Sequence, residues 1–150
     1  MPAAWAPMNT DSSIQTARTV RIAIDIGIVV AKMESSLSFY RDLLGLSVVA
    51  EVTTSLIGKG RMVQLQHGES LIKLVELHNP PSKPGPTDIS EFLGYRYITL
   101  LVAELDVIMA KIKARNISIA LPVTQLNNGT RIATVKDPDG NIVEFAQETN

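Results

Sequence analysis

Three polar side chains interrupt apolar strand sequences and have the chemistry of a proton-transfer site. Asp25 stands within a run of isoleucine and valine, and Glu144 stands between Val143 and Phe145. A carboxylate in such surroundings is costly unless it is paired or opens onto a cavity. Two carboxylates in one semi-apolar cavity repel and spread their pKa values, which makes a general acid or base. The Tyr97 hydroxyl would then donate to a developing oxyanion or pass a proton.

Four more polar side chains are candidates for substrate binding. Thr99 and Gln64 would hydrogen-bond a ligand, although exposed strand residues are often polar for no further reason. Lys73 would stabilise an enolate or form a Schiff base, or instead extend along the strand into water. Arg131, like Arg61 in the other half of the chain, would orient an anionic substrate or only keep the surface polar.

An internal repeat positions these side chains. Residues 24–46 and 96–118 share one plan at a shift of 72 positions, with an apolar strand ending in Val-Ala, an amphipathic helix and a β-rich segment. The shift pairs Asp25 with Tyr97, and the turn at Gly68 with that at Gly140. Neither half would bury its apolar face alone. We expect the two halves to form a continuous sheet, with a pocket on the face away from the helices.

Apolar periodicity sets the expected elements. The first half predicts strands at about 22–30, 46–54, 61–67 and 71–78, and a helix at 34–44 that Gly45 ends. The second half predicts a helix at 104–115 ended by Asn116, and a hairpin over 131–147 with a tight turn at 137–140. Pro122 confines its strand to an edge or a bulge. The strand of Asp25 is expected to be central. The expected helix stripes are Met33, Leu37, Tyr40 and Leu44, and Leu105, Ile108, Met109 and Ile112.

The predicted organisation is one domain with an N-terminal arm. Residues 1–20 form the arm and 21–150 the domain, with modules at about 21–78 and 95–148. The segment 79–94 holds four prolines and is expected to link them.

Composition excludes several classes of function. The 150-residue chain is 45% hydrophobic and 19% charged, with a formal net charge of −1, which gives no electrostatic case for nucleic acid or an anionic membrane. It has no cysteine, so disulfides, thiolate metal sites and a cysteine nucleophile are excluded. Residues 1–20 lack the pattern of a secretory signal, and no apolar run is long enough to span a bilayer. We therefore expect a cytoplasmic protein.

Three motifs carry a resemblance to the vicinal oxygen chelate superfamily, which includes glyoxalase I, extradiol dioxygenases and bleomycin resistance proteins. They are SFYRDLLGL at 38–46, GYRYITLLVAELD at 94–106 and DPDGNIVEF at 137–145. The resemblance covers about residues 22–148. It implies an α+β fold in which two βαβββ modules form a half-open, eight-stranded cup with helices on the outer face. It also implies a homodimer that binds a small organic molecule.

The resemblance also implies positions for metal ligands. The first falls on Asp25, the third on Tyr97 and the fourth on Glu144; the second falls on Ile72, Lys73 or Glu76, depending on register. Metal-using members have at least one imidazole ligand, and none of these residues is histidine. If a metal is bound, we expect Mg²⁺ or Mn²⁺, rather than Zn²⁺ or Fe²⁺, on Asp25, Glu76 and Glu144.

The sequence leaves two functions open. The favoured one is a glyoxalase-like enzyme of proton transfer, an isomerase, epimerase, cyclase or lyase, with Glu144 or Asp25 as base and Tyr97 as acid. The alternative is a metal-free protein that binds a drug or natural product, as bleomycin resistance proteins do. A ring-cleaving dioxygenase would need two histidines, and His67 and His78 are expected in a turn and at a strand end.

Overall fold

The computed structural model describes residues 23–55 and 58–149, so the predicted arm at 1–20 lies outside the described residues. The elements follow the order that the repeat predicts. The first module has β1 (Ile26–Val29), α1 (Met33–Leu37) continued by η1 (Ser38–Leu43), β2 (Ser47–Thr54), β3 (Gly60–His67) and β4 (Ser70–Leu77). The second has β5 (Tyr97–Leu101), α2 (Leu105–Ala114), β6 (Ile119–Gln125), β7 (Arg131–Lys136) and β8 (Ile142–Gln147). In the part described, no helix has the length and apolarity to cross a membrane.

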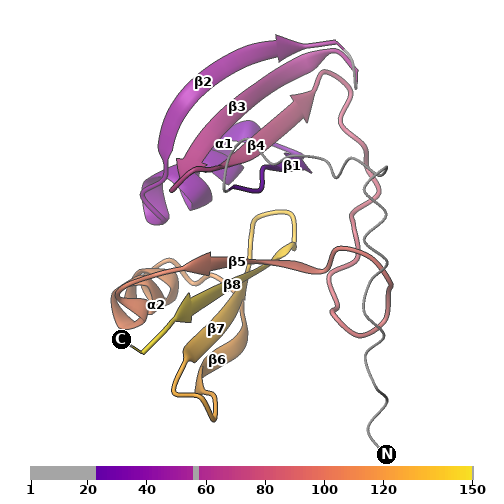
Figure 1. The fold of residues 1–150 in the computed structure, drawn as a ribbon. Helices are drawn as coiled ribbons and strands as arrows, with labels where there is room; N and C mark the ends of the chain where they lie inside the picture. The colour runs from indigo at the N-terminus through magenta and orange to yellow at the C-terminus, as the bar shows by residue number, and fades with distance from the viewer. Residues whose placement is uncertain (1–22, 56–57, 150) are drawn as a thin grey trace, which may run out of the picture.

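Each module forms its own four-stranded sheet, in the order β1-β4-β3-β2 and β5-β8-β7-β6 (Figure 1). The first strand of each module pairs parallel with the last, and the other pairings are antiparallel. The α+β fold with two βαβββ modules around a half-open cup is therefore confirmed. Two details differ from expectation. Within the described residues no strand pairing joins the two sheets, so they do not form the expected continuous sheet. In addition, β1 is an edge strand that begins after Asp25.

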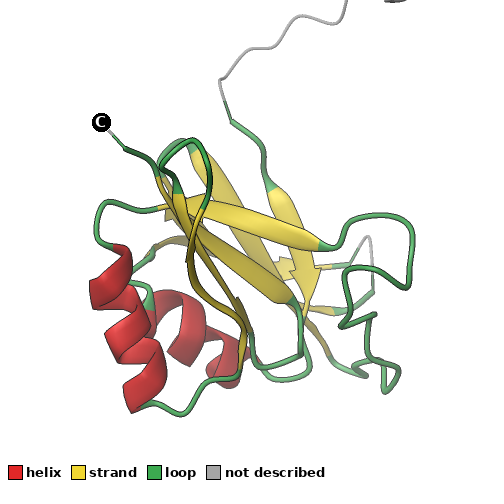
Figure 2. Cartoon of the chain, turned by 90° about the horizontal axis from the view of Figure 1, so that it is seen from below, coloured by secondary structure: helices red, strands yellow, loops and turns green. Residues whose placement is uncertain are grey.

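Both helices lie on the same side of the strands (Figure 2), and one core joins them to both sheets. Alternate strand residues point to that core because successive side chains of a strand take opposite faces. Leu74 and Leu65 of the first sheet and Val143 and Phe145 of the second are fully buried there. The other side of each sheet, which we call the cup face, carries the intervening residues.

Backbone geometry explains where the helices end. In η1 the turn is widened, with the Leu44 N–H donating to the Phe39 carbonyl five residues back at 3.1 Å. Leu43 is buried together with Met33, Leu37 and Tyr40 of the predicted stripe, whereas Leu44 is only partly buried. Gly45 and Asn116 then take left-handed φ angles of 77° and 54°, as their predicted role at helix ends requires.

The segment between the modules has no helix or strand in the described structure and is largely exposed. It crosses the 137–140 turn, since a Cβ built on Gly140 would come within 2.7 Å of the Thr87 side chain. Gly140 also has a φ of 88°, so both the close approach and the turn require glycine there. The strand of Pro122 is an edge strand with register shifts, as predicted.

The same turn fastens the second module to the first helix. The buried Tyr40 hydroxyl donates to Asp137 Oδ2 at 2.7 Å, and the Ala31 N–H donates to the Asp139 carboxylate at 3.3 Å. Arg115, just after α2, donates to the Ser38 carbonyl at 3.0 Å. Together with the shared core, these bonds hold the two sheets in one arrangement.

The Asp139 carboxylate should make stability depend on pH. Burial raises its pKa, with a further contribution from the charge of Asp137, against the opposing hydrogen bond from Ala31. An acid with a raised pKa favours the folded state at low pH, and this stability is lost as pH rises through the folded pKa. We expect Asp139→Asn to be slightly more stable than the native protein at pH 7, as measured by urea unfolding, and the gain to be small because water screens this carboxylate. The gain should vanish below the ordinary aspartate range.

Asp88 is the matched control, because its pKa is lowered by hydrogen bonds from the backbone and side chain of Ser90. Its stabilising contribution is present above the unfolded pKa and lost on acidification. Asp88→Asn should therefore change stability at pH 7 in the opposite direction. A gain in both variants would contradict the assignment to Asp139.

Candidate functional site

An ion pair occupies the cup face of the first sheet. Lys73 Nζ lies 3.3 Å from Asp25 Oδ2, and their side chains are 32% and 22% exposed. Asp25 Oδ1 also accepts the Leu71 N–H at 3.0 Å. Gln64 is the neighbour of Lys73 across the β3–β4 ladder, so it shares this face. The structure thus brings together three predicted site residues, with the Lys73 charge held by Asp25.

A carboxylate and a hydroxyl occupy the matching face of the second sheet. Glu144 Oε1 accepts the Thr99 hydroxyl at 2.8 Å, and the two residues are direct partners in the β5–β8 ladder. Tyr97 begins β5 two residues earlier, on the same face, and is 51% exposed. Ile142 and Ala146, which flank Glu144 on this face, are buried. Glu144 is therefore a half-buried carboxylate in an apolar stretch, oriented by Thr99.

The ladders settle which residue of the first module corresponds to Glu144. Gly27 pairs with Lys73 in the first sheet, and Thr99 pairs with Glu144 in the second. Since Gly27 and Thr99 are 72 positions apart, Lys73 is the repeat counterpart of Glu144, at a shift of 71. Of the three alternatives left open by the sequence, the structure selects Lys73, and Ile72 faces the core.

Glu76 points to the helix side, away from the cup face. Its carboxylate accepts the Met33 N–H at the start of α1, and Gln147 Oε1 accepts the Leu105 N–H at the start of α2 at 2.9 Å. The two modules thus use the same device: a side chain of the last strand satisfies a helix N–H that has no partner within the helix. Glu76 is accounted for by this capping role.

Arg131 also points to the helix side of its sheet, where it bonds Asp106. Its guanidinium makes two bonds to the Asp106 carboxylate, at 3.0 and 2.7 Å, near the start of α2. Arg61 bonds Glu34 at 2.9 Å in the first module, and Glu34 and Asp106 are 72 positions apart. These pairs connect a strand to a helix in each module, so we leave Arg131 and Glu76 out of the site.

The residues do not form the predicted metal centre. With Glu76 turned to α1, the carboxylates left on the cup face are Asp25, already paired with Lys73, and Glu144. A lysine ammonium has no lone pair to give a metal. Residues 23–55 and 58–149 bring no three His, Cys, Asp or Glu side chains together as ligands. The predicted set of Asp25, Glu76 and Glu144 therefore does not fit Mg²⁺ or Mn²⁺.

A cavity of about 700 Å³, which we call the junction cavity, lies where the two modules meet. One wall comes from the surroundings of Asp25, including Ile24 and Leu71, and the other from Thr99 and its neighbours on β5. Its lining is mostly apolar, with His67 and Thr99 among the polar groups. Sequence reasoning placed His67 in a solvent-facing turn, but it ends β3 and is half-buried. The sequence pattern of β3 could not reveal this position, because the opposite wall of the cavity comes from β5, which is distant in the sequence.

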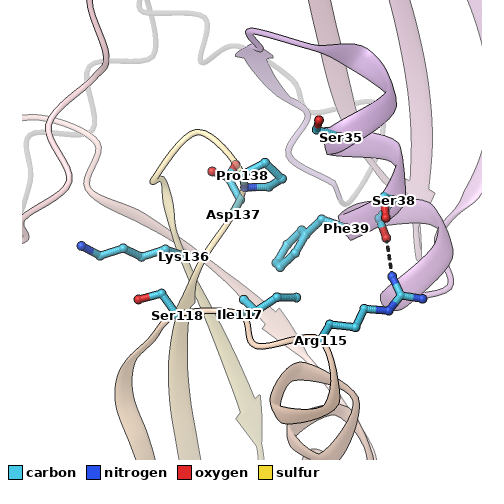
Figure 3. A pocket seen from close by; sticks show the side chains of 9 residues that line it. All are labelled: Ser35, Ser38, Phe39, Arg115, Ile117, Ser118, Lys136, Asp137 and Pro138. Atoms are coloured by element: carbon cyan, nitrogen blue, oxygen red, sulfur yellow. Dashed lines mark hydrogen bonds between the residues drawn. The ribbon is translucent and has the colours of Figure 1, made fainter.

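A second cavity, of about 340 Å³, lies on the helix side between η1 and the second module (Figure 3). Phe39 and Ile117 give it an apolar floor, and Arg115 closes one end through its bond to the Ser38 carbonyl. Lys136 and Pro138 lie along another side. This hollow is a gap in the joint between the modules, separate from the polar residues of the cup face.

Comparison with known proteins identifies the family. The profile described as Glyoxalase/Bleomycin resistance protein/Dioxygenase superfamily matches residues 21–145. The uncharacterized protein YaeR of Escherichia coli strain K12 is 24% identical over 123 residues, which is 82% of this chain and 93% of that protein.

Two solved structures share the fold. A glyoxalase family protein from Bacillus cereus has a TM-score of 0.75 at 19% identity, with 91% of this chain and 100% of that chain covered. The trypanothione-dependent glyoxalase I of Leishmania major has a TM-score of 0.64 at 22% identity, with 83% and 84% covered. The chain belongs to the glyoxalase/bleomycin resistance protein/dioxygenase superfamily.

Proposed function

We propose that the protein is an enzyme that removes and returns a carbon-bound proton of a small organic molecule, in a reaction of the isomerase, epimerase, cyclase or lyase type. The observation that carries this proposal is the environment of the Glu144 carboxylate. It is a half-buried carboxylate on the cup face, set among buried apolar residues and oriented by the Thr99 hydroxyl. A positioned carboxylate of this kind is suited to general base catalysis.

In the proposed step, a Glu144 oxygen takes the proton from a carbon next to a carbonyl. The electron pair of the broken C–H bond forms a carbon–carbon double bond, and the π pair of the carbonyl moves to its oxygen, which gives an enolate. Tyr97, on the same face, would donate its O–H to that oxygen. The protonated Glu144 then returns the proton to the same or a neighbouring carbon. Asp25 is the weaker candidate for the base because it is paired with Lys73 and accepts the Leu71 N–H.

Deuterium exchange tests this proposal without knowledge of the natural substrate. The protein, dialysed against chelator, is incubated in D₂O with small carbonyl compounds, and the loss of their C–H signals is followed by proton NMR. We expect catalysed exchange in at least one compound. Absence of exchange over a broad set of compounds, together with binding of some of them, would favour the alternative of a binding protein.

That alternative has its own supporting observation. The junction cavity is mostly apolar, and the cup face exposes large apolar side chains such as Leu101, which is 57% exposed. Such a surface suits sequestration of an apolar drug or natural product. Retention of the compound without exchange is the result that distinguishes this function from catalysis.

We also propose that the protein is a homodimer; its cytoplasmic location remains a prediction. The chain between β4 and β5 exposes several large apolar residues, with Leu93 99% and Tyr95 98% exposed, and such surfaces are typical of protein contacts. Sedimentation velocity should give a dimer for the native chain and mostly monomer for Leu93→Ser with Tyr95→Ser. A native monomer at micromolar concentration would refute the proposal.

A further inference from the structure

The cup face is charged asymmetrically at two positions that the repeat makes equivalent. Lys73 of the first module and Glu144 of the second are ladder partners of Gly27 and Thr99, which are themselves repeat counterparts. In the second module Thr99 holds a carboxylate; in the first, glycine leaves that place empty of a side chain and Asp25 holds an ammonium. The residue that the repeat makes equivalent to Glu144, the proposed base, is therefore a lysine held by Asp25.

We propose that Lys73 is the anion-binding residue of this site, and that the substrate is a small organic carboxylate with an acidic C–H next to a carbonyl. This inference rests on the proposed function and names its substrate class. An ammonium is a point charge with three donors, so it can bond Asp25 and a substrate carboxylate or enolate oxygen together. It also favours the enolate over the neutral ketone, because negative charge grows on oxygen as the proton leaves.

The surroundings of the pair support a role beyond surface polarity. Both side chains are mostly covered, and Asp25 is further fixed by the Leu71 backbone, so the ammonium is held in one place. Leu71 also lines the junction cavity, as does Thr99, the partner of Glu144. The cavity is thus lined by one residue that bonds Asp25 and by one that bonds Glu144. In contrast, the lysines on α2 are exposed on the far side of the molecule.

The test compares charged and neutral forms of one molecule. Binding of 2-oxobutanoate and of its methyl ester is measured by thermal shift over a concentration series, and C3–H exchange in D₂O by proton NMR. We expect the native protein to bind the acid more tightly than the ester. Lys73→Met should weaken binding of the acid by about 10-fold to 100-fold, as expected for loss of a bond to a charged group. Binding of the ester should change little.

Three further variants distinguish loss of the Lys73 charge from unfolding and from a general effect of removing a lysine. Lys73→Arg keeps the charge and should retain most of the preference for the acid. Asp25→Asn with Lys73→Met restores neutrality if the single variant unfolds, and it should also lack the preference. Lys113→Met removes an exposed α2 lysine and should behave as the native protein.

The outcomes separate this inference from the proposed function. Equal binding of acid and ester by the native protein, or an unchanged preference in Lys73→Met, overturns the role of Lys73 even if exchange occurs. Failure of the native protein to bind the acid also overturns it. Tight, Lys73-dependent binding without exchange supports the anion site and counts against Glu144 as a base.

Discussion

Glu144→Gln should abolish most of the catalysed deuterium exchange. A positioned general base contributes about 10²-fold to 10⁴-fold to a proton transfer, so we expect the exchange rate to fall by that factor. Glutamine keeps the shape of glutamate and can still accept the Thr99 hydroxyl through its amide oxygen. The fall should therefore arise from the lost basicity alone, with unfolding in urea nearly unchanged.

The control for this variant lies four residues further along the chain. Glu148 is an exposed carboxylate beyond the end of β8, and Glu148→Gln makes the same chemical change outside the cup. It should exchange at the native rate. Compound binding by Glu144→Gln should persist in the thermal-shift assay. If Glu144→Gln exchanges within a few-fold of the native protein, Glu144 is not the base.

The repeat allowed most of the fold to be predicted, because its signals are local. Helix stripes, the glycine and asparagine at helix ends, and the edge position of the Pro122 strand each depend on residues close in sequence. The structure places all of them as expected. The predicted strand at 22–30 was too long, since pairing with β4 covers only β1. Asp25 therefore stands just outside the strand rather than within a central one.

The second position of the site could not be predicted from a fixed shift. The repeat runs at 72 positions through the helices but at 71 through the last strand of each module, as the pairs Met33–Leu105 and Glu76–Gln147 show. A slip of one residue moves every side chain of a strand to the other face. It therefore decides whether Ile72 or Lys73 faces the cup, and only the ladders fix it.

Contacts between distant segments were likewise invisible in the sequence. The caps on the helices come from strands more than forty residues away, and the sequence pattern at Glu76 reads equally well as a ligand or a surface residue. Asp137 had an adequate local explanation as the first residue of a tight turn. Nothing near it in sequence indicates its bond to Tyr40, which is 97 residues away.

Asp137→Ala should cause the largest loss of stability among the changes considered. Asp137 is nearly buried and accepts four hydrogen bonds, from the Tyr40 hydroxyl, the Asn141 side chain and the backbone N–H groups of Asp139 and Asn141. Alanine would leave these donors without their partner, among them a fully buried hydroxyl. Unpaired buried donors cost about 1–3 kcal/mol each, so a loss of roughly 3–5 kcal/mol in the free energy of unfolding is expected.

A double-mutant cycle assigns part of this loss to the contact between the modules. Burial, with the charge of Asp137, raises the pKa of Tyr40 well above its ordinary value, so the hydroxyl stays protonated and donates throughout the neutral range. Tyr40→Phe should cost about 1–2 kcal/mol in the native protein. It should cost almost nothing when Asp137 is already alanine, because the stranded hydroxyl is then removed. Glu148→Gln, at an exposed side chain beyond the end of β8, is the control with no expected change. Additive costs in the double variant would mean that Asp137 stabilises only its own turn and that its bond to Tyr40 adds nothing to the contact between the modules.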